Sequence, residues 1–246
     1  MFSIPFLKSK EKKNRGKLDK VLIWMRRFLL FFLLSSLLAV WVFRFVPIRL
    51  TPLMLIRVCQ QWSDGKSAKI QQKWVPIEKI SAHMIHCVIA SEDNKFLDHN
   101  GFDYEAIKKA KKQNKKGGKV YGASTISQQV AKNVFLWPRR SWIRKGLEAY
   151  FTVLIEIFWS KERIMEVYLN VVELGDGIYG VESASTFYYK HSSSKLNRYE
   201  AAMLATCLPS PLKYNPKKPT QKMLSKQLKI INLSKKVKQT SWGLHF

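Results

Sequence analysis

The sequence predicts a mostly α-helical protein with one N-terminal transmembrane helix. Apolar residues recur at three- and four-residue spacing in several segments after residue 76, and helix-capping side chains precede several of these segments. A long apolar run lies near the N-terminus. The sequence has no alternating apolar and polar series, which would predict a strand-rich fold, and no internal repeat.

The chain is strongly basic. Its 246 residues carry a formal net charge of +26, from 43 Lys and Arg against 17 Asp and Glu. This excess predicts a polyanionic partner: nucleic acid, an anionic membrane surface or a phosphate-rich substrate. Hydrophobic residues make up 46%, which suits one domain with a buried core and a small appendage. The three cysteines are widely spaced, which argues against a disulfide framework.

The apolar run is expected to be a membrane anchor at residues 28–46. The preceding residues, 1–27, hold nine Lys or Arg and two acids, and this bias predicts a basic tail in the cytoplasm. A cleaved signal peptide has the same basic start and apolar core, but no small-residue cleavage site follows. A buried core helix is the other alternative.

Interruptions of the apolar patterns predict the boundaries of the remaining segments. Residues 47–75 are expected to connect the anchor to a domain, because two prolines and a Ser-Asp-Gly turn interrupt them. The domain is expected at 76–216 and a basic C-terminal tail at 217–246. A Lys-rich stretch with two adjacent glycines, at 108–119, is expected to be mobile.

Helix boundaries are predicted from capping patterns. A helix is expected to begin at Pro76, which suits a first helical turn, and to run to Glu92. Asp103 and Ser160 are expected to cap two further helices, and Thr125 begins a capping-box pattern. Later elements are a long amphipathic helix at 147–158, a glycine-rich turn at 175–180 and a final helix at 200–208.

Two glutamates are candidates for acid–base chemistry. Glu92 ends an apolar helix, and a carboxylate beside an apolar wall can have a raised pKa, which suits a general base. On position alone, however, a helix that simply ends in solvent is the stronger interpretation. Glu148 lies four residues after Arg144, and an ordinary ion pair explains this spacing. Paired carboxylates serve sugar transfer through an oxocarbenium-like transition state.

Cations flank the same region. Lys132, Arg144 and Lys145 could bind a pyrophosphate leaving group through charge-assisted hydrogen bonds. A solvated basic face is the plain alternative in so basic a chain.

Five strings resemble, in order, the motifs of family 51 glycosyltransferases. The first three are ASEDNKFLDHNG at 90–101, similar to EDxxFxxHxG, then GASTISQQVAKN at 122–133 and RKGLE at 144–148. The fourth and fifth are KERIMEVYLNVVELGDGIYG at 161–180 and LNRYEAAMLATCLPSP at 196–211. Each string is weak alone, but the ordered set is highly specific. The chain has no room for the transpeptidase domain of bifunctional relatives, so the monofunctional type is expected.

The resemblance implies a lysozyme-like α fold and an enzyme of peptidoglycan synthesis. Such an enzyme transfers the growing lipid-linked chain to the 4-hydroxyl of lipid II, with inversion and release of undecaprenyl pyrophosphate. The resemblance implies that Glu92 is the base, and that Glu148 assists at the pyrophosphate through a divalent metal, Mg or Mn. Positions that line the cleft correspond to Asp93, Phe96 and His99. Positions that contact phosphate and sugar correspond to Thr125, Gln129, Lys132, Asn133, Arg144 and Lys145.

The same resemblance sets the expected surroundings. It implies the bacterial cytoplasmic (inner) membrane, with the N-terminus in the cytoplasm and the catalytic domain on the outer, periplasmic face. The expected partners are lipid II, the growing glycan chain, membrane lipids and other cell-wall synthesis and division proteins. Nucleic acid is not an expected partner.

Two other functions compete with this one. A lysozyme-like hydrolase would share the fold and one glutamate, with water replacing the acceptor hydroxyl. The second and third motifs, with their cations, argue against it. A membrane-tethered, non-enzymatic module that binds polyanions would explain the charge. The ordered motifs and the outward topology argue against that module.

Overall fold

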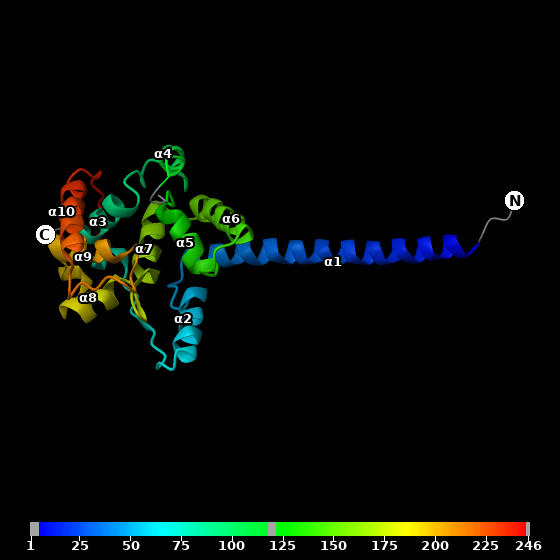
Figure 1. Cartoon of the computed structure of the whole chain (residues 1–246), viewed down its shortest axis with the longest axis horizontal. Coiled ribbons are helices and arrows are strands. Elements are labelled where there is room, and N and C mark those ends of the chain that lie inside the picture. Colours follow the sequence, from blue (N-terminus) through cyan, green and yellow to red (C-terminus); the bar gives the residue numbers. More distant parts are fainter. Residues whose placement is uncertain (1–4, 118–121, 245–246) are drawn as a thin grey trace. The chain divides into compact units, whose positions relative to one another are not determined.

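The structure is a computed structural model that describes residues 5–117 and 122–244, with side chains from residue 19 onward. The chain divides into two compact units, Met1–Phe45 and Val46–Phe246. Figure 1 shows the elements of both units in the order of the sequence. Each unit is considered by itself below.

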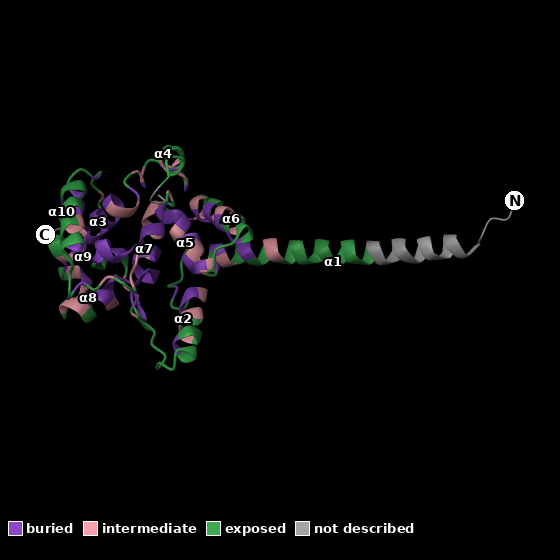
Figure 2. Cartoon of the chain, in the orientation of Figure 1, coloured by how far each residue is buried: buried purple, intermediate pink, exposed green. Residues whose placement is uncertain are grey.

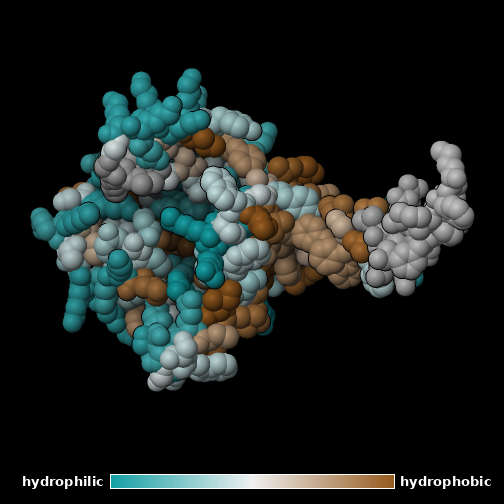
Figure 3. Space-filling view, turned by 45° about the vertical axis from the view of Figure 1, so that its right-hand side comes forward, coloured by the Kyte–Doolittle hydropathy of each residue, from teal (hydrophilic) through white to brown (hydrophobic). Residues whose placement is uncertain are grey.

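The first unit is one long helix, α1 (Pro5–Phe43). Its part Asp19–Phe43, with a mean hydropathy of 1.9, is the one helix in the described chain that is long and apolar enough to cross a membrane. Figure 3 shows hydrophobic colour over most of its described surface. The helix begins well before the expected anchor at 28–46, in the basic segment, and ends at Phe43, while the anchor itself stays a prediction.

The described part of the second unit contains nine α-helices, two short 3₁₀ helices and three very short strands. In chain order these are α2 (Pro52–Ser63), β1 (Gln71–Gln72), η1 (Ile77–Lys79), α3 (Ala82–Glu92), α4 (Tyr104–Asn114), α5 (Ile126–Phe135), α6 (Trp142–Phe158), α7 (Lys161–Val171), β2 (Glu173–Gly175), β3 (Ile178–Tyr179), α8 (Val181–Tyr189), η2 (Ser193–Lys195), α9 (Arg198–Cys207) and α10 (Gln221–Ser234). The predicted fold class, mostly α with one N-terminal apolar helix, is confirmed.

Two helix groups form the core of the second unit. Helix α3 packs against α9 and α10, and α5 packs against α6 and α7. Figure 2 shows that buried residues concentrate in α3, α5, α7 and α9. Phe96, Tyr168 and Tyr179 are among the largest fully buried side chains. This packing fixes the C-terminal end of α3 and the first turns of α5, the two places where motif residues gather.

A small sheet lies beside the helices, with β3 between β1 and β2. β3 pairs parallel with β1 and antiparallel with β2. The predicted glycine-rich turn is the connection between β2 and β3. Gly177 has a φ of +71°, and a Cβ there would lie 2.6 Å from the Lys69 carbonyl oxygen. Only glycine fits such a position without a shift of the backbone.

The capping predictions are confirmed. Asp103 accepts a hydrogen bond from the Ala106 amide at the start of α4, and Ser160 accepts one from the Arg163 amide in α7. Thr125 forms a complete capping box at the start of α5. The Lys-rich stretch expected to be mobile is helical up to Asn114, and part of that stretch lies outside the described residues.

The helix predicted from Pro76 to Glu92 is broken. Residues Ile77–Lys79 form a single 3₁₀ turn, and α3 begins only after Ser81. Between them Ile80 is extended, and its carbonyl accepts a hydrogen bond of 2.8 Å from the Leu244 amide. A pairing with residues more than 160 positions away cannot be read from local periodicity.

Both segments that flank the expected domain belong to the folded unit. The expected connecting segment, 47–75, contains α2, which is capped by Thr51 and buries Leu53 and Met54. The expected tail, 217–246, contains α10, which packs against α9 and α3. Three of its four buried residues, Met223, Ile230 and Ile231, are apolar, while lysines occupy much of its exposed face.

Candidate active site

Glu92 is the last residue of α3 and carries the strongest signs of a functional carboxylate. Its Oε2 accepts a hydrogen bond of 2.9 Å from Nε2 of Gln129 on α5. Burial raises the pKa of Glu92, against the lowering effects of this hydrogen bond and of the charges on Lys226 and Lys132. From position alone the stronger interpretation was a helix that ends in solvent, and the structure instead gives Glu92 the partly desolvated surroundings of the other interpretation.

Two cavities lie on either side of this hydrogen bond. The first, here called the α4 cavity, has a volume of about 170 Å³ and is lined by Glu92 with residues of the α4 start and the loop before α5, including Asp103 and Ser124. The second, the α2 cavity, has a volume of about 210 Å³ and includes Gln129 and Arg57 in its walls. One hydrogen bond, from Gln129 to Glu92, therefore joins the walls of the two cavities.

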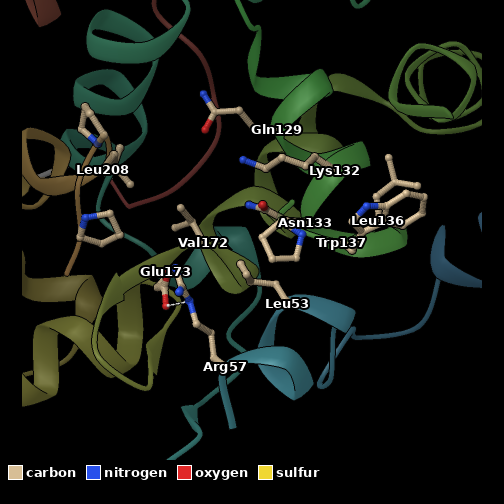
Figure 4. A pocket seen from close by; sticks show the side chains of 13 residues that line it. Leu53, Arg57, Gln129, Lys132, Asn133, Leu136, Trp137, Val172, Glu173 and Leu208 are labelled. Carbon is tan, nitrogen blue, oxygen red and sulfur yellow. Dashed lines mark hydrogen bonds and ion pairs between the residues drawn. The ribbon is translucent and has the colours of Figure 1, made fainter. Parts of the chain in front are cut away.

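Lys132 is the main cation of the α2 cavity. Figure 4 shows its side chain extending from α5 into the cavity, one turn of helix after Gln129 and beside Asn133. Burial lowers the pKa of Lys132, and the charge of Glu148 is the largest influence in the opposite direction. Within the described chain the Lys132 ammonium makes no hydrogen bond or ion pair. A partly desolvated cation that faces a cavity is suited to bind an anion.

Arg57 is a cavity residue that the sequence analysis missed. It enters from α2, opposite Lys132 (Figure 4), and its Nε and Nη2 bind the two carboxylate oxygens of Glu173 at 3.0 and 3.1 Å. Burial raises the pKa of Glu173, while Arg57 opposes that rise. The sequence signal for this helix was a Thr-Pro pair, Thr51 and Pro52, at an N-cap and first turn.

Glu148 lies on α6 and is buried away from both cavities. Its Oε2 accepts a hydrogen bond of 2.6 Å from Nη1 of Arg144, and its Oε1 pairs with the Lys145 ammonium. Arg144 is also buried, whereas Lys145 is exposed. Glu148 reaches the cavity residues electrostatically, through its effect on the pKa of Lys132.

The divalent metal expected at Glu148 has no ready protein site. Both carboxylate oxygens are already engaged by cationic side chains. In the part of the chain that the structure describes, no group of three His, Cys, Asp or Glu could hold a metal ion. These donors do not fit a resident ion held by the protein. The metal stays a prediction of the sequence analysis, and no chemical step is derived through it.

The first motif mainly positions α5. Asp93 accepts a hydrogen bond of 3.0 Å from the backbone amide of Ile126, and its other oxygen lies 3.0 Å from Nε2 of His99. Thr125 donates a hydrogen bond of 2.6 Å to the carbonyl of Gly101. These contacts hold the start of α5 against the loop that follows Glu92.

Phe96 departs from the expectation that it lines the cleft. Its side chain is completely buried, so the ring offers no surface to a substrate. The Lys161 ammonium lies 4.6 Å from the ring centroid, a cation–π contact that adds to the packing. Phe96 therefore contributes to the core beneath the first motif.

Two further residues near Glu92 were not assigned to the site from the sequence. Lys226 on α10 lies close enough for its charge to oppose the rise in the pKa of Glu92. Tyr168 on α7 donates a hydrogen bond of 3.3 Å to Oε1 of Gln129. Lys226 was missed because α10 was expected to be a tail, and Tyr168 because its spacing marked it as a core residue.

A family model, described as transglycosylase, matches residues 59–235. The chain belongs to the transglycosylase family. The match reaches beyond both ends of the domain expected from the sequence, in agreement with the inclusion of α10 in the folded unit. The transglycosylase domain has the lysozyme-like, mostly helical architecture that the motif resemblance implied.

Relatives of this transglycosylase come from several bacteria, and each is named a biosynthetic peptidoglycan transglycosylase. The protein of Bacteroides thetaiotaomicron is 50% identical over 216 residues, which cover 88% of this chain and 87% of the relative. That of Bdellovibrio bacteriovorus is 51% identical over 210 residues, or 85% and 84% of the two chains. That of Caulobacter vibrioides is 51% identical over 192 residues, or 78% and 81%.

Proposed function

We propose that this transglycosylase polymerises the glycan strands of peptidoglycan and transfers the growing lipid-linked chain to the 4-hydroxyl of lipid II. One observation carries the proposal: a carboxylate with a raised pKa lies where two cavities adjoin, and a desolvated lysine faces one of them. A transferase needs room for two substrates, a base for the acceptor and cations for the leaving group. The names of the relatives support this substrate class.

The proposed reaction assigns one cavity to each substrate. The acceptor sugar occupies the α4 cavity, where Glu92 removes the proton of the 4-hydroxyl. The acceptor oxygen then attacks the anomeric carbon of the donor as the bond from that carbon to the pyrophosphate breaks. Attack from the face opposite the leaving group inverts the anomeric configuration. The proton ends on Glu92, and the electron pair of the broken bond ends on undecaprenyl pyrophosphate.

The leaving pyrophosphate is assigned to the α2 cavity. Lys132 faces it directly, and Arg57 lies on the opposite wall, paired with Glu173. Asn133 supplies a polar side chain beside Lys132. Apolar residues of the same cavity, Leu53 and Trp137 among them, suit the lipid-proximal part of the donor. Glu148 sustains this arrangement, since its negative charge favours the charged form of Lys132.

The enzyme is proposed to work at the outer face of the bacterial inner membrane. The apolar part of α1 supports anchoring, and the basic residues before it favour a cytoplasmic N-terminus. A basic surface and a membrane anchor suit a lipid-borne, diphosphate substrate. Other cell-wall synthesis and division proteins are proposed partners.

The test is polymerisation of labelled lipid II by the full-length protein in detergent, with a divalent metal present. Glu92→Gln keeps the side-chain shape but removes the base, so we expect polymer from the wild type and none from the variant. Lys132→Met removes the cavity cation, and we expect a loss of activity of about 100-fold, as for a charge-assisted contact worth about 3 kcal/mol.

Other outcomes would point to other functions. Equal polymer from wild type and Glu92→Gln would overturn the choice of base. Release of soluble fragments from preformed glycan, without any lipid requirement, would favour a lysozyme-like hydrolase. Salt-dependent polyanion binding with neither activity would favour the tethered binding module.

A further inference from the structure

The amide of Gln129 bridges the proposed base and a buried tyrosine. Its Nε2 donates to Oε2 of Glu92 at 2.9 Å, and its Oε1 accepts from the Tyr168 hydroxyl at 3.3 Å. An amide has a donor end and an acceptor end, and rotation by half a turn exchanges them. The two partners of Gln129 therefore decide which end faces Glu92.

Tyr168 is well suited to fix that choice. Its side chain is fully buried on α7, and in the described chain its hydroxyl has no other hydrogen-bond partner. Burial also raises the pKa of Tyr168, so the hydroxyl keeps its proton at neutral pH. If the amide turned over, this proton would lose its acceptor, and a buried donor without an acceptor is unfavourable.

The orientation matters because the amide makes the one hydrogen bond that the Glu92 carboxylate has among the described residues. The charged groups that act on Glu92 are Asp93, which directly follows α3, Lys132 on α5 and Lys226 on α10. An NH₂ group that faces Glu92 stabilises the carboxylate, whereas an amide oxygen in that place would stabilise the protonated acid.

We propose that Tyr168 is a positioning residue for the base, because its hydroxyl locks the Gln129 amide with the NH₂ end toward Glu92 and so keeps the carboxylate ready to accept a proton. This inference rests on the proposed role of Glu92 in glycan polymerisation. Tyr168 has no contact with substrate in this scheme and acts only through Gln129.

The first experiment compares Tyr168→Phe with the wild type by the pH dependence of kcat/KM. Phenylalanine keeps the buried ring but frees the amide to turn. We expect the acid limb to move up by about 0.5–1 pH unit, which lowers kcat/KM by about three- to tenfold on that limb. On the plateau above the limb, kcat/KM should approach the wild-type value.

A double-mutant cycle tests the route through Gln129. Gln129→Leu removes the amide, so we expect an acid limb raised at least as far as in Tyr168→Phe. The double variant Tyr168→Phe, Gln129→Leu should then match Gln129→Leu alone, because Tyr168 has nothing left to position. Additive shifts in the double variant would overturn the proposal.

Tyr179→Phe is the matched control. Tyr179 is also fully buried, and its hydroxyl has no hydrogen-bond partner among the residues that the structure describes. Its removal should leave the acid limb where it is in the wild type. If Tyr168→Phe lowers kcat/KM equally at every pH, or if both tyrosine variants shift the limb alike, Tyr168 is only a core residue.

A second measurement separates this inference from the proposed function. The Glu92 carboxyl can be titrated without substrate by infrared difference spectroscopy, with Glu92→Gln to identify its band. We expect its pKa to be higher in Tyr168→Phe than in the wild type. An unchanged pKa would overturn the inference even if the wild type makes polymer. A raised pKa in a protein that makes no polymer would uphold the positioning and overturn the function.

Discussion

At the scale of single residues, Glu92 shows how a fold tunes a carboxylate. Burial favours its protonated form, and Gln129, Lys132 and Lys226 favour its ionised form. The net effect is a raised pKa, which suits a base that must return its proton after each transfer. The same balance predicts that this residue lowers the stability of the protein at neutral pH.

Glu92→Gln should therefore stabilise the fold in a pH-dependent way. A carboxyl whose pKa is raised on folding destabilises the native state as pH rises from the ordinary value near 4 through the raised value. We expect wild type and variant to unfold alike near pH 4. At pH 8 the variant should be more stable, by about 1.4 kcal/mol for each unit of raised pKa.

Denaturant unfolding at both pH values measures this difference. Glu78→Gln, a change of an exposed glutamate on η1, is the matched control and should show no pH-dependent gap. A wild type that is the more stable protein at pH 8 would contradict the expected sign.

At the scale of elements, α10 changes the boundary of the domain. Its apolar face covers α9 and α3, with Met223 packed against Met203 and Cys207. Its Lys226 lies near the proposed base at the end of α3. One helix therefore completes the core and contributes a charge to the active site.

We expect Ile230→Ala to destabilise the second unit by about 2–5 kcal/mol, because Ile230 is only 2% exposed on α10. Leu228, two residues earlier on the same helix, is 56% exposed, and Leu228→Ala should change stability by less than about 0.5 kcal/mol. Thermal unfolding of the two variants makes the comparison. Equal, small effects would mean that α10 lies outside the core of the second unit, as part of the basic tail expected at 217–246.

At the scale of the whole molecule, the candidate membrane span and the folded core belong to different units. The apolar segment Asp19–Phe43 belongs to the first unit, and the two cavities, Glu92, Lys132 and Lys226 belong to the second. Because the second unit has its own core, it should fold without α1.

A protein that consists of residues 46–246 should therefore keep the thermal unfolding midpoint of the full-length protein to within about 2–4 °C, the change expected for 1 kcal/mol in a domain of this size. Without α1, this protein should no longer migrate with lipid vesicles in a flotation assay. Its turnover of lipid II in vesicles should fall below that of the full-length enzyme. The turnover of lipid II in detergent should change less than the turnover in vesicles. A midpoint that drops by 10 °C or more would show that α1 is part of the fold.

The sequence by itself determined the features that are local. Apolar spacing and caps such as Asp103, Thr125 and Ser160 specify helices because each signal involves residues within a few positions. The ordered motifs predicted that Glu92, Gln129 and Lys132 belong to one site. The apolar run predicted the long apolar helix of the first unit, since its length and composition are properties of neighbouring residues.

Only the tertiary structure decided the contacts that join distant segments. The break at Ile80, the pairing of Arg57 with Glu173 and the position of Lys226 near Glu92 connect residues more than 100 positions apart. Tertiary packing also turned Phe96 from an expected cleft residue into a core residue. The hydrogen bond from Tyr168 to Gln129 likewise joins two different helices. Such contacts depend on how whole helices pack, and local periodicity carries no information about which helices meet.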